Sequence, residues 1–219
     1  MAAQTRYNSQ KMDFNYWEQY YSKQNAELMP SLFAHYVSDL LGDKQVDIIE
    51  LGCGNGRDSI FFAKKGYNVD AIDQCYNEIC FLLNQYQQID NLDFRCDDFT
   101  DLVDDEPYDV VYSRFTLHSV NKEQETRTLG WAYRNLKKDG LLCIEVRGQK
   151  NEIYKMGEAV DNEPDAYIYD NHYRRFLNFD NLCDELKKIG FSLDFAAEDK
   201  DFAPFNGQNE TYIRVIARK

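Results

Sequence analysis

The chain has 219 residues, the size of one domain, and is 43% hydrophobic and 29% charged, as expected of a globular protein that can bury a core. Its net charge of -13 disfavours nucleic acid as a partner, because like charges repel. The N-terminus lacks the apolar segment of a signal peptide and no apolar stretch approaches the roughly 18 residues of a membrane span, so we expect a cytoplasmic protein without a membrane span.

Two helices are predicted before residue 45, over 13–24 and 31–42, the second capped by Ser31 and ended by Gly42. From residue 46 onward, short apolar runs alternate with helical patterns. The predicted strands are 46–51, 67–73, 92–96, 108–115 and 141–147, and the predicted helices are 57–66, 77–88 and 122–138, the last ended by Gly140. Residues 148–177 are polar and rich in tyrosine, without a regular pattern; a helix at 179–190 and strands at 191–198 and 211–218 follow.

The alternation implies right-handed βαβ units and a parallel sheet covered on both faces. The last two strands have no helix between them, so we expect them to pair antiparallel at one edge. The predicted fold is α/β and Rossmann-like: a doubly wound, mostly parallel seven-stranded sheet with a C-terminal antiparallel hairpin and an N-terminal helical cap. We expect a single domain over 1–219, divided into a cap (1–45), a cofactor-binding core (46–147), an insertion (148–177) and the C-terminal helix and hairpin (178–219).

The six cysteines form no CxxC motif and no repeated spacing, and the three histidines are scattered. We therefore expect reduced core thiols rather than a disulfide framework or a zinc site. The acidic stretch 97–106 could be imagined as a metal site, but beyond its first two aspartates a solvated loop is the simpler interpretation. No metal is predicted.

The stretch "ELGCGNG", residues 50–56, lies between the first core strand and its helix, at the edge where open parallel sheets bind ligands. Gly52, Gly54 and Gly56 allow a tight turn and a close approach to a ligand. Arg57 stands where a dinucleotide fingerprint has its third glycine, which disfavours an NAD(P)-linked oxidoreductase. Asp73 ends the second strand, where a carboxylate can accept hydrogen bonds from ribose hydroxyls. The pattern predicts a ligand with an unphosphorylated ribose.

"IIELGCGNG", Asp73, "FRCDDF" and "YDVVYSRFTLHSV" resemble the ordered motifs of class I S-adenosylmethionine-dependent methyltransferases, over residues 47–147. The resemblance implies that S-adenosylmethionine (S-adenosyl-L-methionine) binds at the glycine turn and that S-adenosyl-L-homocysteine is the product. The cofactor-binding residues that it implies are Glu50, Gly52, Cys53, Gly54, Gly56, Asp73, Gln74, Asp97, Asp98, Phe99 and Ser113.

"YWEQYY", "PSLFA", "YSRFTLHSV" and "HYRRFLNFDNLCDEL" resemble small methyltransferases encoded with enzymes of cell-surface polysaccharide biosynthesis. By that likeness Tyr16, Tyr21 and Phe33 close over the cofactor. The physical basis is that a cationic sulfonium is attracted to an aromatic face by about 0.5–2 kcal/mol. The alternative is that these aromatic side chains pack the N-terminal helices onto the sheet.

His118 follows the fourth core strand, where we expect it to face the transferred methyl group. An unperturbed pKa near 6.5 suits it as a catalytic base at neutral pH. The alternative is that His118 holds the following loop by hydrogen bonds. Arg114, beside Ser113 at the end of that strand, is assigned to the acceptor.

A second candidate cluster for binding the acceptor is His172, Tyr173, Arg174 and Arg175. Guanidinium groups suit phosphate or carboxylate, although either arginine could instead pair with a surface acid. Loops of this length without regular structure are usually lids or binding segments, so we expect 148–177 to form a lid over the acceptor.

The sequence thus predicts a methyltransferase acting on a small anionic acceptor: a sugar, sugar nucleotide or phosphorylated glycan precursor, with O-methylation favoured. A hydroxyl acceptor would need His118, whereas a phosphate oxygen would depend more on the arginines. The alternatives are N-methylation of an amino sugar or other small amine, and a non-catalytic cofactor-binding module. Methylation of nucleic-acid bases is disfavoured, because "SRFTLH" stands where such enzymes commonly have an Asn/Asp-Pro-Pro-aromatic motif. Monomer and homodimer both stay open.

Overall fold

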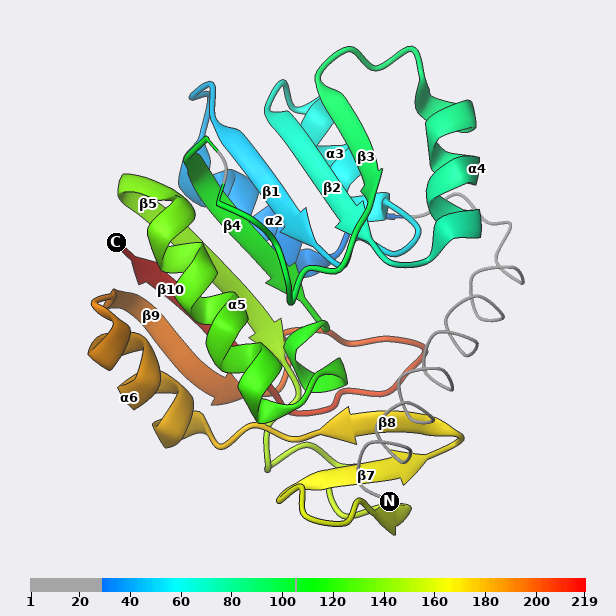
Figure 1. The fold of residues 1–219 in the computed structure, drawn as a ribbon, viewed down its shortest axis with the longest axis vertical. Coiled ribbons are helices and arrows are strands. Elements are labelled where there is room, and N and C mark those ends of the chain that lie inside the picture. The colour runs from blue at the N-terminus through cyan, green and yellow to red at the C-terminus, as the bar shows by residue number, and fades with distance from the viewer. Residues whose placement is uncertain (1–28, 105) are drawn as a thin grey trace.

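The computed structural model describes residues 29–104 and 106–219. Its central sheet has seven strands in the order β3-β2-β1-β4-β5-β10-β9, and a second sheet has three, in the order β6-β7-β8 (Figure 1). The strands are β1 (Asp47–Leu51), β2 (Asn68–Asp73), β3 (Leu92–Cys96), β4 (Tyr108–Arg114), β5 (Leu136–Val146), β6 (Glu158–Ala159), β7 (Ala166–Tyr169), β8 (His172–Arg175), β9 (Ser192–Asp199) and β10 (Tyr212–Arg218). The helices are α2 (Leu32–Leu41), α3 (Arg57–Lys64), α4 (Tyr76–Tyr86), α5 (Lys122–Asn135), α6 (Phe179–Ile189) and the 3-10 helix η1 (Leu117–Ser119).

The seven-stranded sheet has the predicted topology. Strands β1 to β5 pair parallel, whereas β10 pairs antiparallel with both β5 and β9. The strand order reverses between β1 and β4, so the crevice at their carboxyl ends is the topological switch point where such sheets bind ligands. The prediction of a doubly wound, mostly parallel sheet with a C-terminal hairpin is therefore confirmed.

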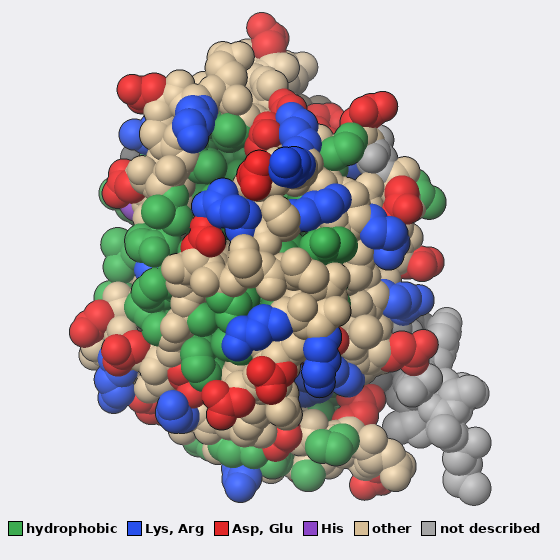
Figure 2. Space-filling model, turned by 90° about the vertical axis from the view of Figure 1, so that its left-hand side faces the viewer, with side chains coloured by type: hydrophobic (Ala, Val, Ile, Leu, Met, Phe, Trp, Pro, Cys, Tyr) green, Lys and Arg blue, Asp and Glu red, His purple; other side chains and the backbone are tan. Residues whose placement is uncertain are grey.

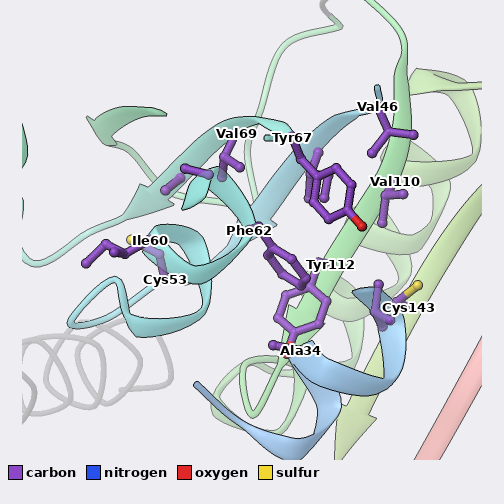
Figure 3. Packing of buried hydrophobic residues seen from close by; sticks show 14 of the residues in the cluster. Ala34, Val46, Cys53, Ile60, Phe62, Tyr67, Val69, Val110, Tyr112 and Cys143 are labelled. Atoms are coloured by element: carbon purple, nitrogen blue, oxygen red, sulfur yellow. The ribbon is translucent and has the colours of Figure 1, made fainter. Parts of the chain in front are cut away.

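Both faces of this sheet are covered, because neighbouring strand residues such as Ile48 and Ile49 point to opposite sides. Helices α2, α3 and α4 pack on one side and α5 and α6 on the other. Figure 3 shows the first of these cores, in which Phe62 of α3 meets Tyr112 of β4 edge to face, with ring centroids 5.1 Å apart. The sheet is thus packed between two hydrophobic clusters, one on each face.

Helix α2 begins and ends where the sequence predicts. The Ser31 side chain accepts a hydrogen bond from the Ala34 amide, and Gly42 adopts a φ of 64° at the other end. Ser31 also donates from its amide and from its hydroxyl to the carboxylate of Asp58, both at 2.7 Å, and the Tyr112 hydroxyl donates to the same carboxylate at 2.9 Å. The start of α2 is thereby attached to the first turn of α3.

The predicted end of the fifth helix at Gly140 is wrong. Helix α5 ends before Leu136, whose backbone is already extended (φ -88°, ψ 141°), and Gly140 lies inside β5. The cause is tertiary: the Lys137 ammonium binds the carboxylates of Asp47 at 2.7 Å and Asp109 at 2.8 Å. These contacts hold residues that have helical sequence character at the start of a strand.

The insertion 148–177 is more regular than predicted, because it contains the antiparallel sheet β6-β7-β8. Its aromatic side chains form a small core, in which the Phe176 ring lies 5.4 Å from Tyr154 and 6.1 Å from Tyr167 between centroids. This sheet lies beyond the carboxyl ends of β4 and β5, and β8 contacts η1 (Figure 1). The insertion thus stands where the predicted lid would have to be.

Polar contacts also fix the outer surface. The Trp131 indole of α5 donates to the Val103 carbonyl at 2.8 Å and so holds the loop that follows β3. On the face shown in Figure 2, Lys and Arg side chains are interspersed with Asp and Glu. Among the described residues, no helix has the length and apolar character needed to cross a membrane.

Candidate active site

The glycine turn after β1 is shaped by backbone conformation. Gly52, Gly54 and Gly56 have φ values of 72°, 53° and 71°, in the left-handed region that favours glycine. The Gly52 and Cys53 amides donate to the Ile72 carbonyl at 2.8 and 2.9 Å, which ties the turn to β2. A side chain at Gly52 would overlap the Cγ2 methyl of Thr116, a residue beyond the end of β4. The turn and the β4 end are therefore in direct contact.

Asp73 closes the other side of this turn. Its carboxylate accepts hydrogen bonds from the Gly54 amide at 2.8 Å and the Cys75 amide at 2.9 Å, one to each oxygen. Burial raises the pKa of Asp73, and the two amides act in the opposite direction. Each carboxylate oxygen has a second lone pair, so Asp73 keeps the capacity to accept from ribose hydroxyls.

Glu50, at the carboxyl end of β1, is buried and accepts a hydrogen bond from the Ser59 hydroxyl. Burial and then the nearby carboxylate of Asp58 raise the pKa of Glu50 well above its usual range. Two buried carboxyl groups beside a glycine turn suit a ligand with a cationic ammonium group, such as an amino-acid moiety. Asp58 was not predicted from the sequence, although it directly follows Arg57 at the end of the glycine motif.

The residues predicted to lie near the adenine gather on the β2–β3 side of the turn. Gln74, Asp97 and Asp98 are exposed and Phe99 is half-buried. The Asp97 amide donates to the Asp73 carbonyl at 3.1 Å, which joins the ends of β2 and β3. The Phe99 ring would lie 3.8 Å from a Cβ atom placed on Gly52. The structure therefore brings these predicted residues to one edge.

Of the three aromatic residues predicted to close over the cofactor, only Phe33 lies within the described residues. Tyr16 and Tyr21 lie outside the described residues. Phe33 is fully buried, stacks on Tyr112 with centroids 5.1 Å apart, and lies 4.9 Å from the Arg214 guanidinium. These contacts favour packing of α2 against the sheet over contact with a cofactor for Phe33.

The chain leaves β4 through a strained residue. Phe115 has a φ of 60°, and seven of the other eight described non-glycine residues with positive φ are Asn or Asp. An aromatic residue in this region costs about 1–3 kcal/mol. Just before and after it, the hydroxyls of Ser113 and Thr116 lie 2.5 Å apart. Such strain persists only where surrounding contacts impose it, and it concentrates at functional sites.

His118 lies in η1, directly after this turn, and is 4% exposed. Its Nδ1 atom is buried and has no hydrogen-bond partner within the described part of the chain. Burial, and then the charges of Arg147, His172, Arg174 and Arg175, hold the pKa of His118 well below 6.5. The imidazole is therefore neutral at neutral pH.

The arginines predicted to bind the acceptor have different surroundings. Arg175 is 8% exposed, pairs with the buried carboxylate of Glu125 and donates from Nε to the Val120 carbonyl at 3.0 Å. Arg114 donates to the buried carboxylate of Glu145 at 2.9 Å. Both guanidinium groups are thus held by the protein itself, which weighs against the roles in acceptor binding predicted for them.

The remaining cluster residues lie on β8. Arg174 is half-buried and donates to the Tyr169 carbonyl at 2.9 Å. Tyr173 donates to Glu163 at 2.6 Å, and His172 is 1% exposed. Because β8 contacts η1, which carries His118, the structure does bring β8 and the end of β4 together.

Arg147, directly after β5, was missed by the sequence analysis. It donates to Asn151 at 2.8 Å, pairs with Glu210, and lies 5.1 Å from the Tyr212 ring and 5.9 Å from the Phe115 ring. Its signal in the sequence was its place at the carboxyl end of a predicted strand, the edge where sites occur in such sheets.

The six cysteines are all free thiols, and four of them are buried. Within the described residues, no three His, Cys, Asp or Glu side chains are grouped so that they could hold a metal ion.

A model of the methyltransferase domain family matches residues 19–194 of the chain. An uncharacterised methyltransferase of Staphylococcus carnosus is 23% identical over 171 residues, which cover 77% of this chain and 81% of that protein. A malonyl-[acyl-carrier protein] O-methyltransferase of Bacillus cytotoxicus is 26% identical over 164 residues, which cover 73% of this chain and 55% of that protein. Among solved structures, an S-adenosylmethionine-dependent methyltransferase of Methanosarcina mazei superposes with a TM-score of 0.72 at 19% identity, covering 84% of this chain and 96% of that one.

These matches agree with the site, in which three left-handed glycines lie between a buried acid at the end of β1 and a carboxylate at the end of β2. The chain belongs to the methyltransferase domain family and has the fold of S-adenosylmethionine-dependent methyltransferases.

Proposed function

We propose that this methyltransferase transfers the methyl group to an oxygen atom of a small anionic acceptor and that His118 is the catalytic base. The observation that carries the proposal is the environment of His118: a buried, neutral imidazole at the carboxyl end of β4, with a free Nδ1 atom among the described residues and three arginines near it. When bound, S-adenosylmethionine supplies an electrophilic methyl group on sulfur and leaves as S-adenosylhomocysteine.

The task of the protein is then to align the acceptor and to remove its proton. A neutral imidazole can take the proton of an acceptor hydroxyl while the oxygen–methyl bond forms. Thr116, the residue directly before η1, lies against Gly52 of the glycine turn. This contact supports the proposal that His118 faces the methyl group of a donor held by that turn.

We propose that Arg147, which Glu210 holds, contributes positive charge and that Arg174 attracts the anionic part of the acceptor. They come from the β5 end and from β8, and both act on the pKa of His118. An anion bound beside them would offset their positive charge and so raise the pKa of His118. The base would then gain strength when the acceptor arrives.

The acceptor class is proposed from this chemistry. Sugar phosphates, sugar nucleotides and phosphorylated glycan precursors carry both a hydroxyl and an anion, as the site requires, and would place the enzyme in polysaccharide biosynthesis. The Bacillus cytotoxicus relative is named for a malonyl acceptor, so small carboxylates belong in the same test. A cationic amine would be repelled by the arginines, which disfavours N-methylation.

The test is transfer of an isotopically labelled methyl group from S-adenosylmethionine to pooled sugar nucleotides, phosphosugars, glycan precursors and small carboxylates, read by mass spectrometry. We expect one labelled product whose fragmentation places the methyl on oxygen. His118→Ala is the matched control and should give far less product. A product labelled on nitrogen, or equal product from His118→Ala, would contradict the proposal.

A further inference from the structure

The turn that carries His118 is held from three strands at once. The Phe115 amide donates to the Glu145 carbonyl of β5 at 2.8 Å. The Phe115 ring stacks on Tyr212 of β10, with centroids 4.8 Å apart and planes 29° apart. The Arg114 guanidinium of β4 lies 4.0 Å from the Phe115 ring. Both the backbone and the ring of Phe115 are therefore fixed by neighbours.

We call Arg114, Tyr212 and Glu145, which hold Phe115, the clamp. The charged side chains of the clamp are paired with one another. The Glu145 side chain is 1% exposed and accepts hydrogen bonds from Arg114 at 2.9 Å and from Arg214 at 2.6 and 3.1 Å. Arg214 comes from β10, the strand that also supplies Tyr212. The Glu145 carboxylate thus holds in place the cation that lies against Phe115.

The consequence of the clamp falls on His118. The Phe115 and His118 rings are neighbours, with centroids 5.9 Å apart and planes inclined by 54°. The left-handed backbone of Phe115 turns the chain out of β4, and η1 follows two residues later. A residue in an ordinary extended conformation would continue the direction of β4 and carry the imidazole away from the glycine turn.

The Phe115 ring packs against Tyr212 and Arg114, which are residues of the protein itself. With its ring held in this way, Phe115 can affect methyl transfer only through the position of a neighbouring residue. We propose that Phe115 is a positioning residue: its strained backbone and clamped ring fix His118 at the site of methyl transfer. The catalytic part of this inference rests on the proposed role of His118, whereas the positional part does not.

The three histidines of the chain allow a direct test, because each imidazole resonance can be assigned by a single substitution. In Phe115→Asn the backbone conformation remains accessible and the ring is lost. We expect the pH titration of His118, followed by NMR, to move toward the unperturbed value near 6.5, as the imidazole becomes hydrated. Turnover with the acceptor pool should fall about 10²-fold, the loss typical of a misplaced catalytic group, with S-adenosylhomocysteine affinity retained.

Phe115→Tyr keeps the ring and should restore both readouts. Tyr212→Leu removes the stacking partner and should shift the His118 titration in the same direction, which keeps the test valid if Phe115→Asn does not fold. Asp139→Gly relieves a positive φ of 65° at an exposed position near the opposite end of β5, and should change neither His118 nor turnover.

The two proposals fail in different ways. Full turnover in His118→Ala together with a shifted His118 titration in Phe115→Asn would remove the base and leave the positioning role standing. A wild-type His118 titration in both Phe115→Asn and Tyr212→Leu would overturn the positioning role, whatever their turnover.

Discussion

The two halves of the site are built by different means. The half formed by β1 and β2 uses backbone groups and residues close together in the chain: the glycine turn, Asp73 and the amides that bind it. The half formed by the ends of β4 and β5 and by β8 uses side chains brought from far apart, such as Phe115 against Tyr212 and Arg175 against Glu125. The first half suits the cofactor, which is the same whatever the acceptor is. The second half can change without disturbing the binding of that cofactor.

This difference implies that cofactor binding and acceptor chemistry can be separated by mutation. The two halves meet where β1 pairs with β4 and where Thr116 lies against Gly52 of the glycine turn. Four substitutions or conditions test the separation.

The largest expected effect is that of His118→Ala. Loss of a catalytic base should lower turnover about 10²–10⁴-fold. Because His118 belongs to the second half, the affinity for S-adenosylhomocysteine, measured by calorimetry, should stay within about twofold, a change too small to count as a lost hydrogen bond. A loss of turnover below about tenfold would leave His118 only a role in holding the loop.

Arg175→Ala should act on stability. Removing Arg175 leaves the buried Glu125 without its guanidinium partner, so we expect the free energy of unfolding to fall by about 3–5 kcal/mol in urea titrations. Arg174→Ala, at the neighbouring half-buried position, is the comparison and should mainly raise the apparent KM of the acceptor. Equal stability of the two variants would show that the Arg175–Glu125 pair does not hold β8 to α5.

Asp73→Ala tests the first half by itself. Unpaired ribose hydroxyls should weaken cofactor binding by about 1–3 kcal/mol, while the NMR titration of His118 stays as in the wild type. Asp93→Ala removes an exposed carboxylate of β3 that has no predicted role in binding and is the matched control. Unchanged cofactor affinity in Asp73→Ala would refute its assignment.

The smallest effect concerns pH. Because the folded protein holds the pKa of His118 well below 6.5, the unfolded chain binds a proton that the folded chain does not as the pH falls below 6.5. This contribution to stability is complete above pH 6.5 and is lost as the pH falls toward the folded-state pKa. Urea unfolding at pH 7 and pH 5 should therefore show a smaller loss for His118→Gln than for the wild type; equal losses would exclude the shift.

The first half of the site was open to prediction because its signals are local. Glycine is the residue type that favours positive φ values, and such values occur at Gly52, Gly54 and Gly56. Asp73 is the last residue of an apolar strand, β2. The sheet order followed from the same alternation of strands and helices. Local sequence signals were therefore sufficient to predict the parts of the site that depend on backbone conformation and strand pairing.

The second half depends on pairs that no local pattern connects. Arg175 was predicted to bind an anion, but in the structure its guanidinium pairs with Glu125, 50 positions earlier in the chain. Phe115 gave no sign of a left-handed conformation, which is imposed by Tyr212 and by the backbone of β5. The end of α5 was misplaced for the same reason, since Lys137 binds Asp47, 90 positions away.

The hydrogen bond from Trp131 to Val103 has a practical consequence. It joins an indole on α5 to the loop that begins with the predicted adenine residues Asp97–Phe99, so the Trp131 ring contacts the loop on which these residues lie. The chain has two tryptophans, and Trp17→Phe would leave a single emitting indole. Fluorescence from that indole would then follow the arrival of the cofactor in real time, without a label and without an acceptor.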